Sequence, residues 1–257
     1  MILDEILTHK RAEVAARKGQ VHPRDVAAAA KDAPPPPSFR RAIAGPGLSF
    51  IAEIKGSSPS AGTIRNGVDA VAVARAYEAG GAAALSVLTD ARYFGGSWES
   101  LHDVSRGSGL PVLCKEFVVD AYQIDEARAT GAAAVLLIAS VLEAGRLADF
   151  LGHAAGWGLA ALVEVHTSDE TAAAVDAGAD IVGINNRDLR TLRVDLDTTA
   201  RLRPLIPAGV LVVSESGFER RAQVEQAERL GVDAVLIGTA LMASPDPAAK
   251  LRELRGM

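Results

Sequence analysis

A chain of 257 residues can form one large α/β barrel or two smaller domains. Hydrophobic residues make up 49% of it and aromatic residues only 4%, so Ala, Val, Leu and Ile must build a core of helices packed on a buried sheet. The net charge of −5 argues against a nucleic-acid or acidic-membrane partner. The single cysteine, Cys114, excludes an intrachain disulfide and a cysteine zinc cluster.

The first residues lack the basic segment and long apolar stretch of a secretory signal. No window approaches the roughly 20 apolar residues that a membrane span needs. We therefore expect a soluble, cytoplasmic protein without a membrane partner.

Residues 2–18 carry apolar side chains at helical spacing, which predicts an amphipathic helix. The four prolines of residues 34–37 then predict a stiff connector, because proline lacks the N–H and fixes φ. We interpret residues 1–48 as an N-terminal helical extension with its connector. Its amphipathic pattern suggests that it folds over the mouth of the domain that follows.

Eight short apolar runs, starting 22 to 34 residues apart, predict eight strand–helix units. The runs are continuously apolar, as in parallel strands covered on both faces. Such units close into a (β/α)8 TIM barrel, so we expect one barrel domain over residues 1–257. An open doubly wound sheet is the alternative, although no G-x-G-x-x-G follows the first strand. The expected strands cover residues 49–55, 83–90, 111–117, 133–140, 159–166, 181–187, 210–216 and 234–240.

Charged and polar side chains gather where these strands end, which is the functional face of a barrel. Side-chain alternation puts Glu53 and Lys55 on one face of their strand, and Asn185 and Arg187 on one face of theirs. Charges inside a barrel are costly unless they pair with each other or meet substrate. A purely structural ion-pair network is the alternative. The other candidates at strand ends are Lys115, Glu164 and Glu215.

Two glycine-containing segments follow the last two strands, Ser216-Gly217 and Gly238-Thr239. The loops after strands 7 and 8 are a frequent phosphate site in barrels, because glycine allows close approach to backbone N–H groups. The pair predicts a small phosphorylated substrate. The five histidines are scattered without ligand spacing, so we expect no metal site.

Motifs spread over almost the whole chain run Glu53-Ile54-Lys55-x-x-Ser58-Pro59-Ser60, Tyr93-Phe94-Gly95-Gly96-Ser97, Lys115-Glu116-Phe117, Leu162-Val163-Glu164-Val165-His166, Gly183-Ile184-Asn185-Asn186-Arg187-Asp188-Leu189, Ser214-Glu215-Ser216-Gly217 and Leu236-Ile237-Gly238-Thr239. Together they resemble the indole-3-glycerol phosphate synthase family of tryptophan biosynthesis. Two departures are Glu116, where the family more often has Asp, and Ala61-Gly62, where a basic residue is common. They put only supporting contacts in doubt.

The resemblance implies a carboxy-lyase that closes the indole ring of a sugar-phosphate substrate without metal or redox cofactor. It implies Lys115 as general acid, Glu164 as base or cation stabiliser in dehydration, and Lys55 as partner of the substrate carboxylate. The remaining residues are implied to orient these groups and hold the sugar (Glu53, Asn185, Glu215), to bind the phosphate and nearby oxygens (Ser58, Arg187, Ser216, Gly217, Gly238, Thr239), or to pack on the aromatic ring (Phe94, Phe117).

Two other functions remain open from the residues. A phosphoribosyl isomerase barrel would need an Asp or Cys acid–base pair at strand ends, and Cys114 lies one residue off the Lys115 face. A catalytically silent barrel could bind a phosphorylated metabolite. The sequence does not indicate whether the chain associates with other enzymes of the tryptophan pathway.

Overall fold

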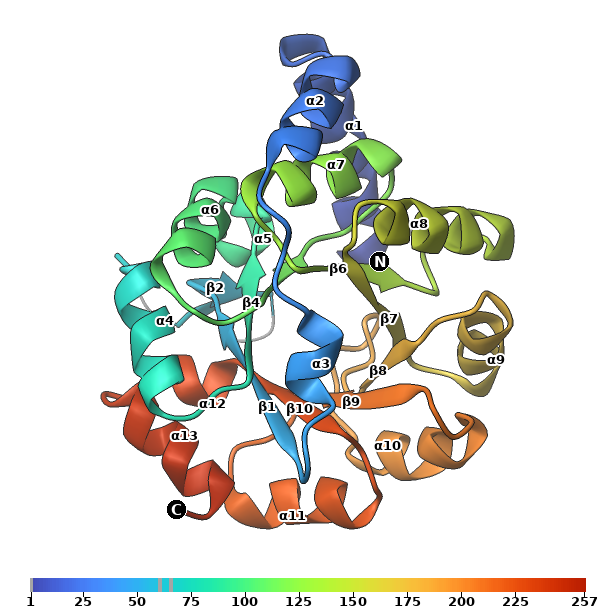
Figure 1. The fold of residues 1–257 in the computed structure, drawn as a ribbon. Helices are drawn as coiled ribbons and strands as arrows, with labels where there is room; N and C mark the ends of the chain where they lie inside the picture. The colour runs from blue at the N-terminus through green and yellow to red at the C-terminus, as the bar shows by residue number, and fades with distance from the viewer. Residues whose placement is uncertain (1, 60–61, 65–66) are drawn as a thin grey trace.

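The computed structural model describes residues 2–59, 62–64 and 67–257. Eight parallel strands close into a barrel in the order β1-β10-β9-β8-β7-β6-β5-β4 (Figure 1). The predicted (β/α)8 barrel is confirmed, and the open sheet is excluded. The barrel strands are β1 (Ser49–Ile54), β4 (Ala84–Leu88), β5 (Val112–Lys115), β6 (Ala134–Ile138), β7 (Ala160–Val165), β8 (Ile181–Asn185), β9 (Leu211–Glu215) and β10 (Ala234–Ile237).

All eight predicted strands are present, but each ends one to three residues earlier than predicted. The polar side chains at the strand ends are one reason. The side chain of Asn185 accepts a hydrogen bond from the backbone N–H of Arg187 at 2.9 Å. Glu116 accepts one from the N–H of Phe117 at 2.7 Å. These bonds replace the ladder partners that a longer strand would need, so the chain leaves the sheet.

Helices cover the outer face of the barrel, as the strand–helix pattern predicts. A two-stranded antiparallel hairpin in the loop after β1 was not predicted, because its strands are only two residues long. The helices are α4 (Ala70–Ala79), α5 (Ala91–Phe94), α6 (Trp98–Gly107), α7 (Ala121–Thr130), α8 (Ala144–Gly156), α9 (Ser168–Asp176), α10 (Asp197–Leu202), η1 (Arg203–Leu205), α11 (Arg221–Arg229), α12 (Thr239–Met242) and α13 (Pro247–Arg255), and the hairpin pairs β2 (Ser57–Ser58) with β3 (Gly62–Thr63).

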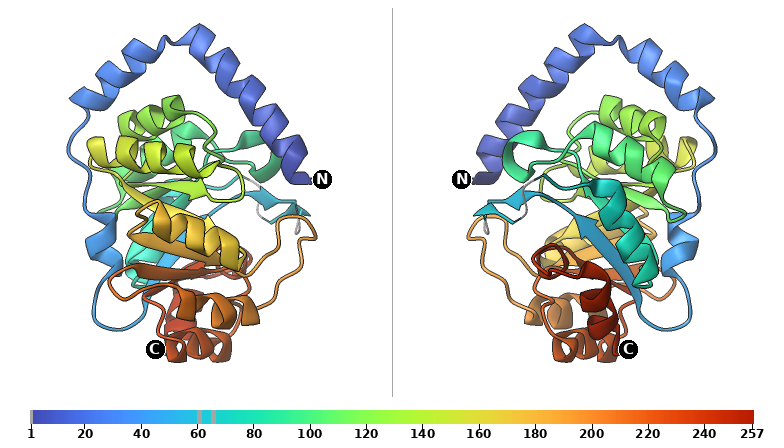
Figure 2. Two further views of the ribbon diagram at one scale, coloured as in Figure 1. Left: turned by 90° about the vertical axis from the view of Figure 1, so that its right-hand side faces the viewer. Right: turned by 90° about the vertical axis from the view of Figure 1, so that its left-hand side faces the viewer.

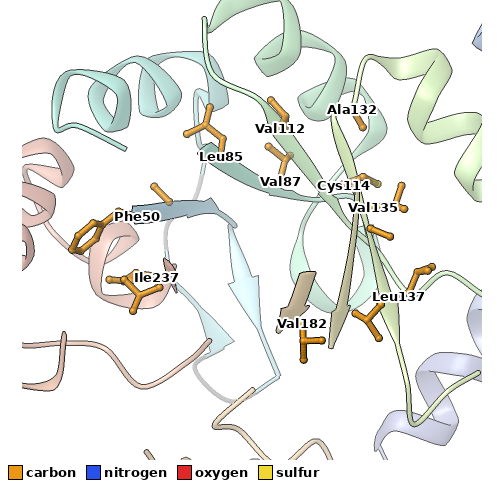
Figure 3. Packing of buried hydrophobic residues seen from close by; sticks show 14 of the residues in the cluster. Phe50, Leu85, Val87, Val112, Cys114, Ala132, Val135, Leu137, Val182 and Ile237 are labelled. Atoms are coloured by element: carbon orange, nitrogen blue, oxygen red, sulfur yellow. The ribbon is translucent and has the colours of Figure 1, made fainter. Parts of the chain in front are cut away.

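Alternation along the strands divides the core into two apolar layers. One layer lies between the strands and the outer helices, and Figure 3 shows Val112, Cys114 and Val135 among its members. The other fills the barrel interior and includes Ile51 and Leu113. Cys114 therefore points outward and its neighbour Lys115 inward, as predicted from the period of two.

Three helices precede the barrel: α1 (Ile2–Gln20), α2 (Pro23–Asp32) and α3 (Phe39–Ile43). The helix predicted over residues 2–18 is confirmed, and the proline run is non-helical. Figure 2 shows α1 and α2 as an arch, and α1 descends toward the end of the barrel at which the hairpin β2–β3 also lies. Phe39 and Ile43 of α3 join the interior layer and close the opposite end of the barrel. Across the described residues, no helix is both long and apolar enough to traverse a membrane.

Candidate active site

A cavity of about 510 Å³ opens at the carboxyl ends of the barrel strands. Thirteen of the fourteen predicted site residues line it. The exception is Ser58, whose side chain lies outside the described part of the structure, as do Ser60 and Ala61. The predicted residues that line the cavity are Glu53, Lys55, Phe94, Lys115, Phe117, Glu164, Asn185, Arg187, Glu215, Ser216, Gly217, Gly238 and Thr239.

Lys115 lies at the centre of the charges in this cavity. Its Nζ is 3.0 Å from Oε2 of Glu164 and 2.5 Å from Oε2 of Glu215. Its side chain is 12% exposed, and the two carboxylates are almost fully buried. An unpaired ammonium or carboxylate would be costly here, so the three groups hold one another in place.

The three groups shift one another's pKa values in different directions. Burial lowers the pKa of Lys115, but the carboxylates of Glu215, Glu164 and Glu53 outweigh burial and raise this pKa above its ordinary range. Burial raises the pKa of Glu215, with further help from the charge on Glu164, to about 7 despite Lys115. Burial also raises the pKa of Glu164, but the charges of Lys115 and His166, together with hydrogen bonds from Lys115 and Asn185, outweigh burial and lower the pKa of that carboxyl. The cavity therefore holds a cationic lysine, an ionised Glu164 and a carboxyl that titrates near neutrality.

Two glycines leave room for the carboxylates of the cavity. Oε1 of Glu53 lies 2.7 Å from Nζ of Lys55, on the opposite wall from Glu164. A Cβ at Gly238 would overlap this Glu53 oxygen, and a Cβ at Gly183 would overlap Oε1 of Glu215. Both positions accordingly need glycine for the placement of an acidic side chain. The sequence did not indicate this role, because the partner strands lie far away along the chain.

Arg187 both faces the cavity and holds the loop that follows β8. Its Nη1 donates a hydrogen bond to the carbonyl oxygen of Leu192 at 2.8 Å. Burial lowers the pKa of Arg187, with a smaller opposing effect of Glu53. The loop contributes Leu189, Leu192 and Val194 to the cavity wall, three apolar residues that sequence reasoning did not single out.

The backbone turns sharply after β9. Ser216 has φ of 69° and Gly217 has φ of 92°, so both adopt the left-handed conformation. Asn186 supports this turn, because its Nδ2 donates to the carbonyl oxygen of Ser216 at 3.1 Å. The turn brings Glu215 and Ser216 to the same cavity, although they alternate along the strand. Asn186 was missed as a supporting residue, since side-chain alternation points it away from the barrel axis.

One side of the cavity is apolar. The rings of Phe94 and Phe117 lie 6.0 Å apart, centroid to centroid, and are tilted by 39°. Ile2, Leu3 and Ile6 of α1 also line the cavity. The first turns of the predicted N-terminal helix therefore form part of the mouth, as its amphipathic pattern suggested.

His166, one of the five histidines that the sequence analysis considered only as metal ligands, is a further polar neighbour of Glu164. Its Nδ1 lies 3.2 Å from Oε2 of Glu170, and its Nε2 lies 3.5 Å from Oε1 of Glu164. Burial lowers the pKa of His166, but Glu170 and Glu164 outweigh burial and raise it. The positive charge that this favours adds to the field that keeps Glu164 ionised.

Comparison with known proteins gives one consistent result. A family model described as indole-3-glycerol phosphate synthase matches residues 3–254. An indole-3-glycerol phosphate synthase of Mycobacterium avium is 45% identical over 253 residues, which cover 98% of this chain and 93% of the relative. One from a Roseiflexus species is 45% identical over 264 aligned positions, which cover 99% and 98% of the two chains.

Among solved structures, a mutant tryptophan synthase α-subunit from Pyrococcus furiosus aligns with a TM-score of 0.60 and 15% identity. It covers 81% of this chain and 98% of the other. A thiamine phosphate pyrophosphorylase from the same organism gives a TM-score of 0.60 at 18% identity, covering 81% and 94%. At such identities the likeness concerns the barrel fold alone.

Proposed function

The chain belongs to the indole-3-glycerol phosphate synthase family, and we propose that the cavity residues divide the work of this reaction as follows. The reaction takes 1-(2-carboxyphenylamino)-1-deoxyribulose 5-phosphate to indole-3-glycerol phosphate, carbon dioxide and water. It belongs to tryptophan biosynthesis and is a carboxy-lyase reaction. Three events are required: a ring carbon attacks the ketone, the ring carboxylate leaves as carbon dioxide, and a hydroxyl group leaves as water.

Lys115 is the general acid of ring closure. As the ring carbon attacks, the electron pair of the C=O bond moves onto oxygen, and this oxygen takes a proton from Nζ. The raised pKa of Lys115 makes it a weak acid toward a neutral ketone but an adequate one toward a developing alkoxide. Before transfer, its positive charge stabilises the same oxygen.

Lys55 holds the substrate carboxylate on the opposite wall. Its ammonium group is paired with Glu53 at 2.7 Å, and Gly238 leaves space beside both side chains. Loss of carbon dioxide leaves the bonding electron pair in the ring and restores its aromaticity. Lys55 is also a candidate donor for the proton that leaves with the hydroxyl group as water.

Glu164 acts in dehydration. Loss of the hydroxyl group leaves a benzylic cation, which the nitrogen stabilises through the aromatic ring, and removal of one proton from the carbon between this centre and the nitrogen completes the indole. An ionised carboxylate can stabilise the cation or accept the proton, and Lys115 with His166 keeps Glu164 ionised. Asn185, Glu53 and Glu215 orient these groups and the sugar hydroxyls.

The ends of the substrate go to opposite sides of the cavity. The phosphate fits the backbone turn Ser216-Gly217, together with Arg187 and the segment Gly238-Thr239. Ser58 is a further polar contact. The aromatic ring fits the apolar side formed by Phe94 and Phe117. The substrate is thereby stretched across Lys115.

The observation that carries these roles is the position of Lys115, in hydrogen-bond reach of Glu164 and Glu215 inside the cavity. The test is indole fluorescence after mixing the purified protein with the substrate. We expect a rise with the wild type and a roughly 10²–10⁴-fold slower rise with Lys115→Ala. Near-normal turnover of the folded variant would overturn the role of Lys115.

Two rival functions have their own outcomes in this assay. A folded wild-type protein without any fluorescence rise would point to a phosphoribosyl isomerase or to a silent metabolite-binding barrel. Turnover of phosphoribosyl isomerase substrates would then separate these two.

We further propose that residues 1–257 act as one barrel domain. We also propose that the protein works in the cytoplasm, since its single cysteine is buried and forms no disulfide.

A further inference from the structure

A second buried lysine lies outside the cavity, on α1. The side chain of Lys10 is fully buried. Its Nζ lies 3.0 Å from Oε2 of Glu13, 2.9 Å from Oδ2 of Asp90 and 3.1 Å from Oε1 of Glu116. Asp90 and Glu116 are also buried, whereas Glu13 is 30% exposed and also pairs with Arg17. We call Lys10, Asp90 and Glu116 the rim cluster.

Glu116 connects the rim cluster to the end of β5. Its Oε1 accepts the backbone N–H of Phe117 at 2.7 Å, and its Oε2 accepts the hydroxyl of Thr89 at 2.8 Å. Glu116 lies between Lys115 and Phe117 in the chain, and both neighbours line the cavity. Fixing the Glu116 carboxylate therefore fixes the backbone from which the general acid and a ring-side aromatic project.

Asp90 connects the rim cluster to α5. Its Oδ1 accepts the backbone N–H of Tyr93 at 2.7 Å and so caps this short helix. The same helix carries Phe94, which packs against Phe117. A four-residue helix has little stability of its own, so its position depends on this cap and on what holds the cap.

Lys10 connects both carboxylates to α1. Ile6 lies one helical turn before Lys10 and Ile2 lies two turns before it, so all three share one face of the helix. Ile2 and Ile6 line the cavity. The ammonium of Lys10 is thus the common point of three segments that each contribute an apolar residue to the same wall.

We propose that Lys10 is a positioning residue that holds together the ring-side wall of the cavity. Its ammonium ties α1, α5 and the end of β5 into one unit, while the phosphate side around Ser216-Gly217 belongs to other strands. This inference rests on the proposed function, because it assigns the apolar wall to the aromatic ring of the substrate. Lys10 touches neither the reacting atoms nor the cavity and acts only through its neighbours.

The test compares binding at the two ends of the site. Lys10→Met alone leaves two buried carboxylates without a cation and can unfold the chain. The double variant Lys10→Met/Glu116→Gln keeps the side-chain volumes and removes one of those charges. The matched control is Lys18→Met, which removes an ion pair between α1 and Asp120 (2.6 Å) at the surface. Lys10→Arg restores the charge and serves as the rescue variant.

Three measurements on folded variants decide the matter: the KM and kcat of ring closure, the affinity for a reduced, non-cyclising substrate analogue, and inhibition by inorganic phosphate. We expect the double variant to bind the analogue roughly 10- to 100-fold more weakly and to raise KM, with phosphate inhibition unchanged. Lys18→Met should match the wild type, and Lys10→Arg should recover part of the loss.

Equal weakening of analogue and phosphate binding would show a general structural role and overturn the proposal. Wild-type values for the folded double variant would overturn it as well. Both outcomes require turnover by the wild type, whereas an inactive wild type contradicts the proposed function itself. The two failures are therefore distinguishable.

Discussion

Lys10 and Lys115 are both lysines surrounded by carboxylates, and burial and charge act on both in the same way. For each, burial lowers the pKa and the neighbouring carboxylates outweigh burial and raise it. They differ in what lies on the remaining side. Lys115 faces a cavity of about 510 Å³, whereas Lys10 is enclosed by α1, α5 and the end of β5.

We propose that this difference gives the two lysines different tasks. In the cavity there is space for a substrate oxygen, so the ammonium of Lys115 can turn from its carboxylates toward that oxygen. The side chain of Lys10 is fully buried and does not line the cavity, so its ion pairing can only fix geometry. Ion pairing thus indicates a reaction centre only where a cavity accompanies it.

Apart from Lys115→Ala, Glu164→Gln should lower turnover more than any other substitution of a cavity residue. The amide cannot accept a proton or balance a cation, so we expect kcat to fall roughly 10²–10⁴-fold. Stability should change little, since Lys115 keeps its bond to Glu215. The measurement is indole fluorescence at saturating substrate, together with thermal unfolding. A normal kcat would remove Glu164 from dehydration.

A substitution in the rim cluster, by contrast, should lower stability strongly. Lys10→Met leaves the buried carboxylates of Asp90 and Glu116 without their cation, which costs about 3–5 kcal/mol of unfolding free energy. Lys115→Met should cost less, because the side chain of Lys115 is 12% exposed, whereas that of Lys10 is fully buried. In addition Glu215, whose pKa is about 7, can lose its charge by binding a proton. Urea unfolding of both variants measures the difference. Equal losses would contradict the distinction between the two lysines.

Gly183→Ala tests whether Glu215 needs its present position. The added Cβ would overlap Oε1 of Glu215, whose flexible end must move while the backbone stays. We expect roughly a 10- to 100-fold loss of kcat/KM, since displacement of a positioned group by about 1 Å has such effects. Gly145→Ala is the control, because nothing lies within 4 Å of its added Cβ. Unchanged activity in Gly183→Ala would show that the reaction does not depend on the exact position of the Glu215 carboxylate.

The smallest expected effect is a change in pH dependence. The pKa of Glu215 rises from its ordinary value of 4.5 to about 7 in the folded protein. The folded state therefore binds this proton more tightly. The resulting stability is complete below about pH 4.5 and is lost as pH rises through about 7.

Glu215→Gln should accordingly remove an ionisation near neutrality from the pH profile of kcat/KM, and should flatten unfolding free energy between those two pH values. The measurements are initial rates and urea unfolding from pH 4.5 to 8. If the pH profile of the variant still shows an ionisation near neutrality, another group causes it. His166, whose Nε2 lies 3.5 Å from Oε1 of Glu164, is then the group to test.

Much of the candidate active site could be predicted from the sequence, because two local regularities are enough to bring its residues together. The period of two along a strand places Glu53, Lys55 and Lys115 inside the barrel, and closure of eight such units brings their ends together. Family motifs then named the same residues. Strand ends were less predictable, since side chains such as Asn185 capture backbone N–H groups that a longer strand would use.

Only the tertiary structure decided the rim cluster and the shape of the cavity. Lys10 lies 106 positions from Glu116 along the chain, and nothing local distinguishes it from the exposed lysines of an amphipathic helix. The need for glycine at Gly183 likewise comes from a carboxylate on the neighbouring strand. A sequence specifies which side chains share a face through a short-range repeat. Which faces meet, and whether space remains between them, depends on packing between distant segments. This packing places Lys115 against a cavity and buries Lys10 completely.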